Sequence, residues 1–285
     1  MANPTYFEAL KWASSFLSQQ HVEDVGAYLL MGRAHWTQTQ LLTHYRQAMP
    51  ATAWTQFQTD IQTFATGQPA QYILGEAPFY GESFQVTPAT LIPRPETEEL
   101  VEWVLHKLPV TPLTVLDLGT GTGAIGLTLK RLRPQWQVTL SDISPEALAV
   151  AQKNATQQQL TVNLVQGDLF TPVQGQQFDL IVSNPPYIAP TEKAVMDRSV
   201  LEHEPATALF SGTDGLALYR RLLQQLPQYL TAGGQFFGEF GYRQQPALTQ
   251  LCAQLLPNLQ ATFRQDINQQ PRMLHLQHFE QKEDS

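Results

Sequence analysis

Cysteine is nearly absent from this chain, and long apolar runs are absent altogether. Cys252 is the only cysteine among 285 residues, so no disulfide can form within the chain, which fits a reducing compartment. No apolar run approaches the roughly 20 residues of a membrane span, and the N-terminus lacks the basic and apolar segments of a signal peptide. We therefore expect a cytoplasmic protein that does not bind membranes, with Cys252 in a hydrophobic core.

Positive charge is also scarce. Lys and Arg together number 17 against 25 Asp and Glu, and the formal net charge is −8. A surface that grips a nucleic-acid backbone needs concentrated Lys and Arg, so we do not expect direct nucleic-acid binding, although this total leaves room for a local basic patch. The seven histidines are dispersed. His275 and His278 would face opposite sides of a strand, so we expect no metal site.

The length of 285 residues suits two domains, and the sequence changes character twice. Residues 1–69 carry apolar side chains at helical spacing, which predicts a small N-terminal helical bundle that packs or docks a partner. Residues 70–95 predict a linker with a β-hairpin, its strands near 72–75 and 79–86. In that linker Arg94 and Glu96 are either a solvated pair or functional residues. Residues 96–285 form the main predicted domain. The helices expected in the first domain are 6–17, 22–32, 37–45 and 53–66.

Strands and helices alternate through the main domain. The predicted strands are Leu113–Leu118, Gln137–Asp142, Thr161–Gln166, Phe178–Ser183, Gln235–Phe240, Ala261–Asp266 and Met273–His278. The predicted helices are Ala124–Leu132, Pro145–Gln157, Asp214–Leu230 and Gln244–Leu256. Such alternation implies right-handed crossovers and a parallel sheet, with a final hairpin that sets one strand antiparallel. The fold class is therefore α/β.

A glycine-rich loop follows the first of these strands and opens a helix. It spans Gly119 to Gly123, and Gly121, Gly123 and Gly126 satisfy the G-x-G-x-x-G spacing of nucleotide-binding loops. Glycines let the backbone bend sharply and let a ligand approach the main chain. Asp142 closes the second strand, where its carboxylate can accept hydrogen bonds from both hydroxyls of a ribose. These features fit NAD and S-adenosylmethionine equally well.

Asn184-Pro185-Pro186-Tyr187 follows the strand Phe178–Ser183 and is the stretch most indicative of chemistry. Consecutive prolines end the strand and stiffen a loop at the carboxyl edge of the sheet, where open α/β sheets build their sites. The Asn184 side-chain oxygen and the Pro185 carbonyl are two fixed acceptors that can bind both hydrogens of one planar NH2 group. Tyr187 offers a flat ring to pack against that group. The alternative is a plain proline turn without a function.

Three features favour S-adenosylmethionine over NAD. Asp117 supplies a carboxylate that we expect near the sulfonium or the amino group of the cofactor. Asp168 and the backbone N–H that follows it can read an adenine edge at the end of the third strand. The fourth strand ends in the Asn184 loop and not in a hydride-transfer His or Lys arrangement. Asp142 and Asp168 also have simpler interpretations, as a helix cap and a turn residue.

The chain resembles the release factor glutamine methyltransferases, the PrmC/HemK family, from about residue 71 to residue 272. The N-terminal helices match this family only in size and helical character. The matching segments are Gln71–Gly75, Phe79–Gly81, Leu91–Glu98, Asp117–Gly123, Asn184–Ile188, Glu204-Pro205, Ala208–Phe210, Gly212–Leu216, Glu239–Gly241 with Gln244, and Asp266 with Arg272.

The resemblance implies a seven-stranded, Rossmann-like methyltransferase domain behind a helical domain that helps to dock the substrate. That substrate would be a class 1 peptide chain release factor, methylated on the glutamine of its Gly-Gly-Gln motif to give N(5)-methylglutamine and S-adenosylhomocysteine. The implied cofactor-binding residues are Gly119, Thr120, Gly121, Thr122, Gly123, Asp142, Asp168, Leu169 and Asn184. The glutamine would be held by Asn184, Pro185, Pro186 and Tyr187, with catalytic roles for Asn184, Pro185 and Tyr187. Leu169 stands where some relatives have an aromatic residue, so it can give adenine only apolar contact.

Three other functions use parts of the same pattern. An adenine amino-methyltransferase acting on DNA or RNA would share the Asn184 loop, but base flipping requires a basic cleft, which the net charge disfavours. An NAD oxidoreductase would share the glycine loop. A catalytically silent binding protein would need only the helical domain, and the intact Asn184 loop argues against it.

Overall fold

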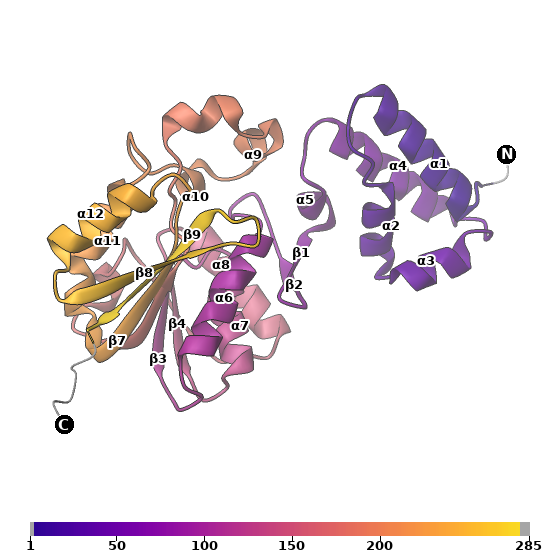
Figure 1. Ribbon diagram of the computed structural model, residues 1–285. Coiled ribbons are helices and arrows are strands. Elements are labelled where there is room, and N and C mark those ends of the chain that lie inside the picture. The colour runs from indigo at the N-terminus through magenta and orange to yellow at the C-terminus, as the bar shows by residue number, and fades with distance from the viewer. Residues whose placement is uncertain (1–2, 280–285) are drawn as a thin grey trace. The chain divides into compact units, whose positions relative to one another are not determined.

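The computed structural model describes residues 3–279 and divides into two compact units. The helical unit comprises the chain up to Glu76 together with Asp197–His203. The sheet unit comprises Ala77–Met196 and the chain from Glu204 onward. Figure 1 shows the helices of the first unit and the central sheet of the second. None of the helices within residues 3–279 is long and apolar enough to cross a membrane.

The helical unit is a bundle with its own apolar core. Its helices are α1 (Tyr6–Gln19), α2 (Gly26–Ala34), α3 (Gln38–His44), α4 (Ala51–Ala65), α5 (Ala70–Leu74) and α9 (Arg198–His203). Thr5 and Glu8 form a capping box at the start of α1, and Thr37 and Gln40 form another at α3, so both helices begin where their first free N–H groups find acceptors. The core includes Ala9, Ala13, Leu17, Leu29, Phe57 and Ile61.

The prediction of a strand at 72–75 is wrong, because these residues belong to helix α5. Pro69 precedes the helix, and Gly75 ends it in the left-handed region at φ 78°, where its N–H donates to the Gln71 carbonyl at 2.8 Å. A short apolar run does not distinguish helix from strand by itself. The hairpin is present but lies later, with β1 at Glu76–Phe79 and β2 at Glu82–Gln85. Tyr80 and Gly81 join them, both with positive φ, as a two-residue hairpin turn requires.

The sheet unit is built on seven strands in the order β5-β4-β3-β6-β7-β9-β8. The first five of these are parallel, and β9 runs antiparallel to both β7 and β8. This arrangement confirms the predicted α/β fold class, including the final hairpin. The strands are β3 (Thr114–Leu118), β4 (Gln137–Asp142), β5 (Asn163–Gln166), β6 (Phe178–Ser183), β7 (Leu230–Glu239), β8 (Leu259–Gln265) and β9 (Pro271–His278).

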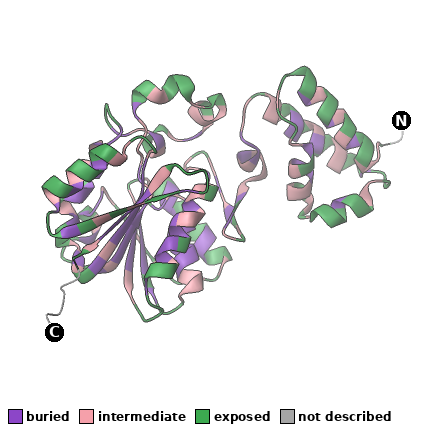
Figure 2. Cartoon of the chain, viewed as in Figure 1, coloured by how far each residue is buried: buried purple, intermediate pink, exposed green. Residues whose placement is uncertain are grey.

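Helices cover both faces of this sheet and enclose a core on each, as the buried strands in Figure 2 show. One core includes Leu100, Leu127 and Ala151 from three helices, and the other includes Tyr219 and Leu248. The helices of the first face are α6 (Pro95–Lys107), α7 (Ala124–Leu132) and α8 (Pro145–Gln157), and those of the second are α11 (Ala217–Gln225) and α12 (Gln245–Leu255). The unit also contains α10 (Ala206–Leu209) and the 3-10 turns Thr171–Val173, Pro190–Val195 and Leu226–Gln228.

Most predicted elements of this unit are confirmed, and one helix is shorter than expected. The predicted helix Asp214–Leu230 begins only at Ala217, because Gly215 takes φ 76°, and it passes into a 3-10 turn at Leu226. Leu230 already belongs to β7, where it pairs with Phe178 of β6.

The predicted burial of Cys252 and the predicted placement of His275 and His278 on opposite sides of a strand are confirmed. Cys252 is buried in the core on the second face, and burial raises the pKa of its thiol to about 11. His275 is buried while His278 is exposed, so they face opposite sides of β9. Within residues 3–279, no three His, Cys, Asp or Glu side chains are grouped to hold a metal ion.

Candidate active site

A cavity of about 430 Å³ lies at the carboxyl ends of β3, β4 and β6, wholly within the sheet unit. This edge is where open α/β sheets bind ligands. The cavity brings together most of the predicted site residues, namely Gly119, Thr120, Gly121, Thr122, Asp142, Asp168, Leu169, Asn184, Pro185 and Pro186. Gly123 and Tyr187 are not part of its wall.

The glycine loop leaves room for a ligand against its backbone. Gly119 and Gly121 have φ of 73° and 55°, and a Cβ added to either would meet no atom within 4 Å. Gly123 serves a different purpose, because a Cβ there would lie 2.8 Å from Leu127 Cδ1. It starts helix α7 in the left-handed region. The open space over Gly119 and Gly121 fits a cofactor of the S-adenosylmethionine class.

Asp117 supports this loop from beneath and does not line the cavity. Its Oδ2 accepts from Thr120 Oγ1 at 2.5 Å and from the Gly126 N–H at 2.9 Å. Burial raises the pKa of Asp117 to about 6 against these two hydrogen bonds. Its carboxylate therefore stabilises the shape of the loop. Its closeness to the sulfonium or the amino group of the cofactor stays a prediction.

Asp142 lies at the end of β4 in the wall of the cavity. Its Oδ2 accepts from the Gly121 N–H at 2.9 Å, and its Oδ1 accepts from the Ser144 N–H at 2.9 Å. Burial raises the pKa of Asp142, and these hydrogen bonds lower it. A carboxylate oxygen has two acceptor positions, so each oxygen of Asp142 can still accept from a ribose hydroxyl.

Asp168 is joined to Arg221, a residue that the sequence analysis missed. Arg221 Nη2 lies 2.5 Å from Asp168 Oδ2, and both side chains line the cavity. Arg221 comes from α11, 53 residues further along the chain, so no local pattern could indicate it. Leu169 is buried with φ 48° beside this pair. Asp168 therefore forms an ion pair with an arginine in the wall of the cavity.

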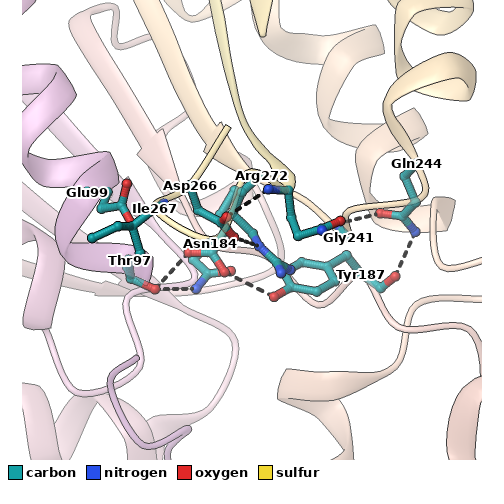
Figure 3. A network of polar contacts seen from close by, with 11 residues as sticks. Thr97, Glu99, Asn184, Tyr187, Gly241, Gln244, Asp266, Ile267 and Arg272 are labelled. Atoms are coloured by element: carbon teal, nitrogen blue, oxygen red, sulfur yellow. Dashed lines mark hydrogen bonds and ion pairs between the residues drawn. The ribbon is translucent and has the colours of Figure 1, made fainter. Parts of the chain in front are cut away.

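The Asn184 loop is anchored by hydrogen bonds to Thr97 and, at Tyr187, to Glu239. Asn184 Nδ2 donates to Thr97 Oγ1 at 3.1 Å, and Thr97 Oγ1 donates to Glu239 Oε2 at 2.7 Å. The Tyr187 hydroxyl donates to the other oxygen of Glu239 at 3.0 Å. Figure 3 shows Thr97, Asn184 and Tyr187 within this network. Thr97 and Glu239 both lie in segments that match the family, but the sequence predicted no contact of either with Asn184.

Tyr187 is packed into the framework of the site. The Tyr187 carbonyl accepts from Gln244 Nε2 at 2.7 Å, and a Cβ added to Gly241 would lie 3.3 Å from the tyrosine ring. Burial and the nearby charge of Glu239 raise the pKa of the Tyr187 hydroxyl, so it stays protonated and donates. Burial also raises the pKa of Glu239, against the hydrogen bonds from Thr97 and Tyr187.

Arg94 is not a solvated linker residue. It lines the cavity and forms an ion pair with Glu204, whose side chain is 1% exposed. Glu204 also accepts from the Ile92 N–H at 3.2 Å. This buried carboxylate therefore fixes the extended segment before helix α6, and with it the start of the helix that carries Thr97.

Comparison with known proteins places this site in a family. Residues 8–75 match the PrmC N-terminal domain, and residues 99–212 match the Methyltransferase small domain. The chain is 45% identical over 269 residues to a release factor glutamine methyltransferase from Enterococcus faecalis, covering 94% of this chain and 97% of the relative. The corresponding protein of Bacillus subtilis is 37% identical over 278 residues, covering 95% and 96%. This chain belongs to the release factor glutamine methyltransferase family.

Solved structures agree with this assignment at the level of the fold. A methyltransferase from Pyrococcus furiosus has a TM-score of 0.54 at 18% identity and covers 70% of this chain and 89% of its own. The 16S rRNA N2 G1207 methyltransferase of Thermus thermophilus, solved with AdoMet and guanosine, has a TM-score of 0.51 at 19% identity, covering 71% and 49%. As a member of its family, this protein is an S-adenosylmethionine-dependent methyltransferase with a Rossmann-like sheet.

Proposed function

We propose that this enzyme methylates the side-chain amide nitrogen of the glutamine in the Gly-Gly-Gln motif of class 1 peptide chain release factors. The family relatives support this substrate, since those described above carry its name. The products are N(5)-methylglutamine and S-adenosylhomocysteine. The helical unit, matched by the PrmC N-terminal domain, takes the role of docking the protein substrate.

One arrangement carries this function. Asn184, Pro185 and Pro186 share a single cavity wall with the open glycine loop, and the Asn184 Nδ2 is already engaged by Thr97. The amide oxygen of Asn184 thus remains the atom available to a ligand. Two fixed oxygens, Asn184 Oδ1 and the Pro185 carbonyl, can accept hydrogen bonds from an uncharged NH2 group. They would repel a negatively charged substrate group.

The cofactor, when bound, supplies a methyl group made electrophilic by a cationic sulfur. Gly119 to Gly123, Asp142, Asp168 and Leu169 would hold it, with Asn184 at the junction of cofactor and substrate. Asn184 Oδ1 and the Pro185 carbonyl would accept the two N–H groups of the glutamine amide and fix the direction of its nitrogen. Both acceptors bind more strongly as positive charge develops on that nitrogen, so they favour the transition state over the ground state.

The alkylated nitrogen is acidic, so it can release its proton to water without a dedicated base. We propose that the transfer needs no metal ion, because the sulfonium already makes the methyl electrophilic. We also propose a cytoplasmic enzyme without direct nucleic-acid binding, in line with its substrate and its net charge of −8. The packing of the Tyr187 ring against the glutamine stays a prediction. In the structure the Tyr187 hydroxyl donates to Glu239, and the ring lies next to Gly241.

Mass spectrometry of a release factor incubated with the enzyme and S-adenosylmethionine tests this function. We expect a gain of one methyl group on the glutamine of the Gly-Gly-Gln motif, absent when the enzyme is omitted. An oligonucleotide containing adenine, incubated in parallel, tests the adenine amino-methyltransferase alternative, which the relatives do not support. Methylated adenine with an unmodified release factor would overturn the proposal.

Replacing Asn184 by Ala gives the first quantitative prediction. We expect the single-turnover rate of methyl transfer to fall roughly 10²- to 10³-fold, as when one transition-state hydrogen-bond partner is removed. Cofactor affinity should fall less than the rate. Asn163→Ala is the matched control, because Asn163 is exposed at the amino end of the edge strand β5 and away from the cavity. A wild-type rate for Asn184→Ala would show that the amide does not act in the transfer.

A further inference from the structure

Thr97 and Glu239 are buried polar residues that the transfer itself does not use. Thr97 is 4% exposed in the first turn of α6, and Glu239 is 2% exposed at the end of β7. They are 142 residues apart in the sequence, yet their side chains form a hydrogen bond beside Asn184. Burying a carboxylate is unfavourable unless hydrogen bonds compensate for the lost water. The burial of Glu239 beside Thr97 and Asn184 therefore calls for a physical explanation.

The direction of each hydrogen bond follows from the chemistry of the partners. The hydrogen bonds from Thr97 and Tyr187 and the nearby charge of Arg272 oppose the effect of burial on the pKa of Glu239 and favour its ionised form. An ionised carboxylate only accepts, so Glu239 Oε2 takes the hydrogen of the Thr97 hydroxyl at 2.7 Å. A hydroxyl has one hydrogen, and Thr97 Oγ1 can therefore only accept from Asn184 at 3.1 Å. Only the Nδ2 end of an amide can donate. The planar amide of Asn184 is thus held with Nδ2 toward Thr97 and Oδ1 directed away from it.

The second oxygen of Glu239 cannot relax this arrangement. It accepts from the Tyr187 hydroxyl at 3.0 Å, so both oxygens of the carboxylate are occupied by hydroxyl donors. Strand β7 lies beside β6, and its Gly238 pairs with Ser183, so Glu239 lies next to the start of the Asn184 loop. The Glu239 carboxylate therefore links Tyr187 directly, and Asn184 through Thr97, and it fixes the orientation of the Asn184 amide.

We propose that Thr97 and Glu239 are positioning residues that select the orientation of the Asn184 amide required for methyl transfer. This inference rests on the proposed function, in which Asn184 Oδ1 accepts from the NH2 of the substrate glutamine. An inverted Asn184 amide would present its own NH2 to that group, so two donors would face each other and the acceptor would be lost. The charge of Glu239 also polarises the hydrogen-bonded chain and makes Asn184 Oδ1 a stronger acceptor.

The test compares Thr97→Val with Thr97→Ser. Valine keeps the shape of threonine but removes the hydroxyl, while serine keeps the hydroxyl and removes one methyl group. We expect the single-turnover rate on a release factor to fall roughly 10- to 100-fold in Thr97→Val, the range for losing a group that orients a functional ligand. Thr97→Ser should retain most of the rate. The affinity for S-adenosylmethionine, measured by calorimetry, should be unchanged in both variants.

A double variant separates positioning from general damage to the site. If Thr97 acts through Asn184, then Asn184→Ala combined with Thr97→Val should be no slower than Asn184→Ala alone. Effects that multiply would overturn the inference, as would a wild-type rate in Thr97→Val or an equal loss in Thr97→Ser.

Glu239→Leu replaces Thr97→Val if the latter does not fold. Leucine has no acceptor, so the Thr97 hydroxyl loses the partner that takes its hydrogen at 2.7 Å and becomes free to donate to Asn184. We expect the same fall in rate and the same non-additivity with Asn184→Ala, and a wild-type rate would overturn the inference. Failure of the wild-type enzyme to modify any release factor would instead overturn the proposed function and the inference together.

Discussion

Asp117 and His275 are buried ionisable residues whose pKa values are displaced in opposite directions. Burial raises the pKa of Asp117 from 3.8 to about 6 and lowers the pKa of His275 from 6.5 to about 4. Between about pH 4 and 6, Asp117 binds more protons in the folded than in the unfolded chain. Its contribution to the free energy of unfolding therefore falls as the pH rises through this range. His275 binds fewer protons when folded, so its contribution rises over nearly the same range. The two slopes oppose each other in the wild-type protein.

The Asp117→Asn variant separates these contributions. The side-chain oxygen of asparagine can still accept from Thr120 and the Gly126 N–H, so the glycine loop should keep its shape. We expect the free energy of unfolding of this variant, relative to that of the wild type, to increase with pH by up to about 1.4 kcal/mol per pH unit between about pH 4 and 6. Urea denaturation at a series of pH values measures this difference. Parallel profiles for the two proteins would show that Asp117 does not titrate in this window.

At the scale of secondary-structure elements, Gly126 sets how closely helix α7 approaches the sheet. A Cβ at Gly126 would lie 2.3 Å from Leu140 Cδ2 of β4 and 2.9 Å from Asp117 Oδ2 of β3. We expect Gly126→Ala to lower the free energy of unfolding by about 1–3 kcal/mol through overpacking, even though alanine favours helix by up to ~1 kcal/mol.

Gly233→Ala is the matched control for this helix contact, measured in the same denaturant titrations. Gly233 is exposed in β7, and an added Cβ there meets no atom within 4 Å. Its effect should stay within roughly 0.5 kcal/mol of zero. If Gly126→Ala changed the free energy of unfolding as little as the control, helix α7 would have to move away from the sheet at little cost in free energy.

The elements that carry the site were predictable because their patterns are local. Strands β3 and β4 are apolar runs that end in a glycine loop and in Asp142, and their predicted ends match the structure closely. Helix α5 was misassigned because five residues offer too few repeats to separate the two periods. The ion pair of Arg221 with Asp168 could not be foreseen, since contacts across 53 residues depend on how α11 packs.

At the scale of the whole molecule, the fold class and the order of elements followed from the alternation of strands and helices, but the relation of Thr97 to Glu239 did not. Their hydrogen bond requires β7 to lie next to β6, with α6 packed against the same sheet. The order of strands in a sheet depends on the complete topology, because each apolar strand could pair with any of several others. The sequence therefore contains Thr97 and Glu239 but does not indicate that they lie side by side.

The division into two units predicts that substrate docking and cofactor binding can be damaged separately. Asp60 is 2% exposed in the helical unit, where it accepts from Arg33 Nε at 2.8 Å, Arg33 Nη2 at 2.9 Å and Gln56 Nε2 at 2.9 Å. Breaking a buried ion pair costs about 3–5 kcal/mol. The Arg33 side chain is 40% exposed and can be solvated, so we expect Asp60→Ala to destabilise the helical unit by only about 2–3 kcal/mol.

We expect Asp60→Ala to lower the thermal transition of this chain and to leave the cofactor site intact. Every residue that lines the cavity belongs to the sheet unit, so the affinity of Asp60→Ala for S-adenosylmethionine should equal that of the wild type in calorimetry. The KM for a release factor should rise while the rate at saturating substrate changes little, because docking weakens and the chemistry does not. Glu23→Ala, an exposed carboxylate of the same unit, serves as the control. A loss of cofactor affinity in Asp60→Ala that Glu23→Ala does not share would mean that the helical unit supports the cavity directly.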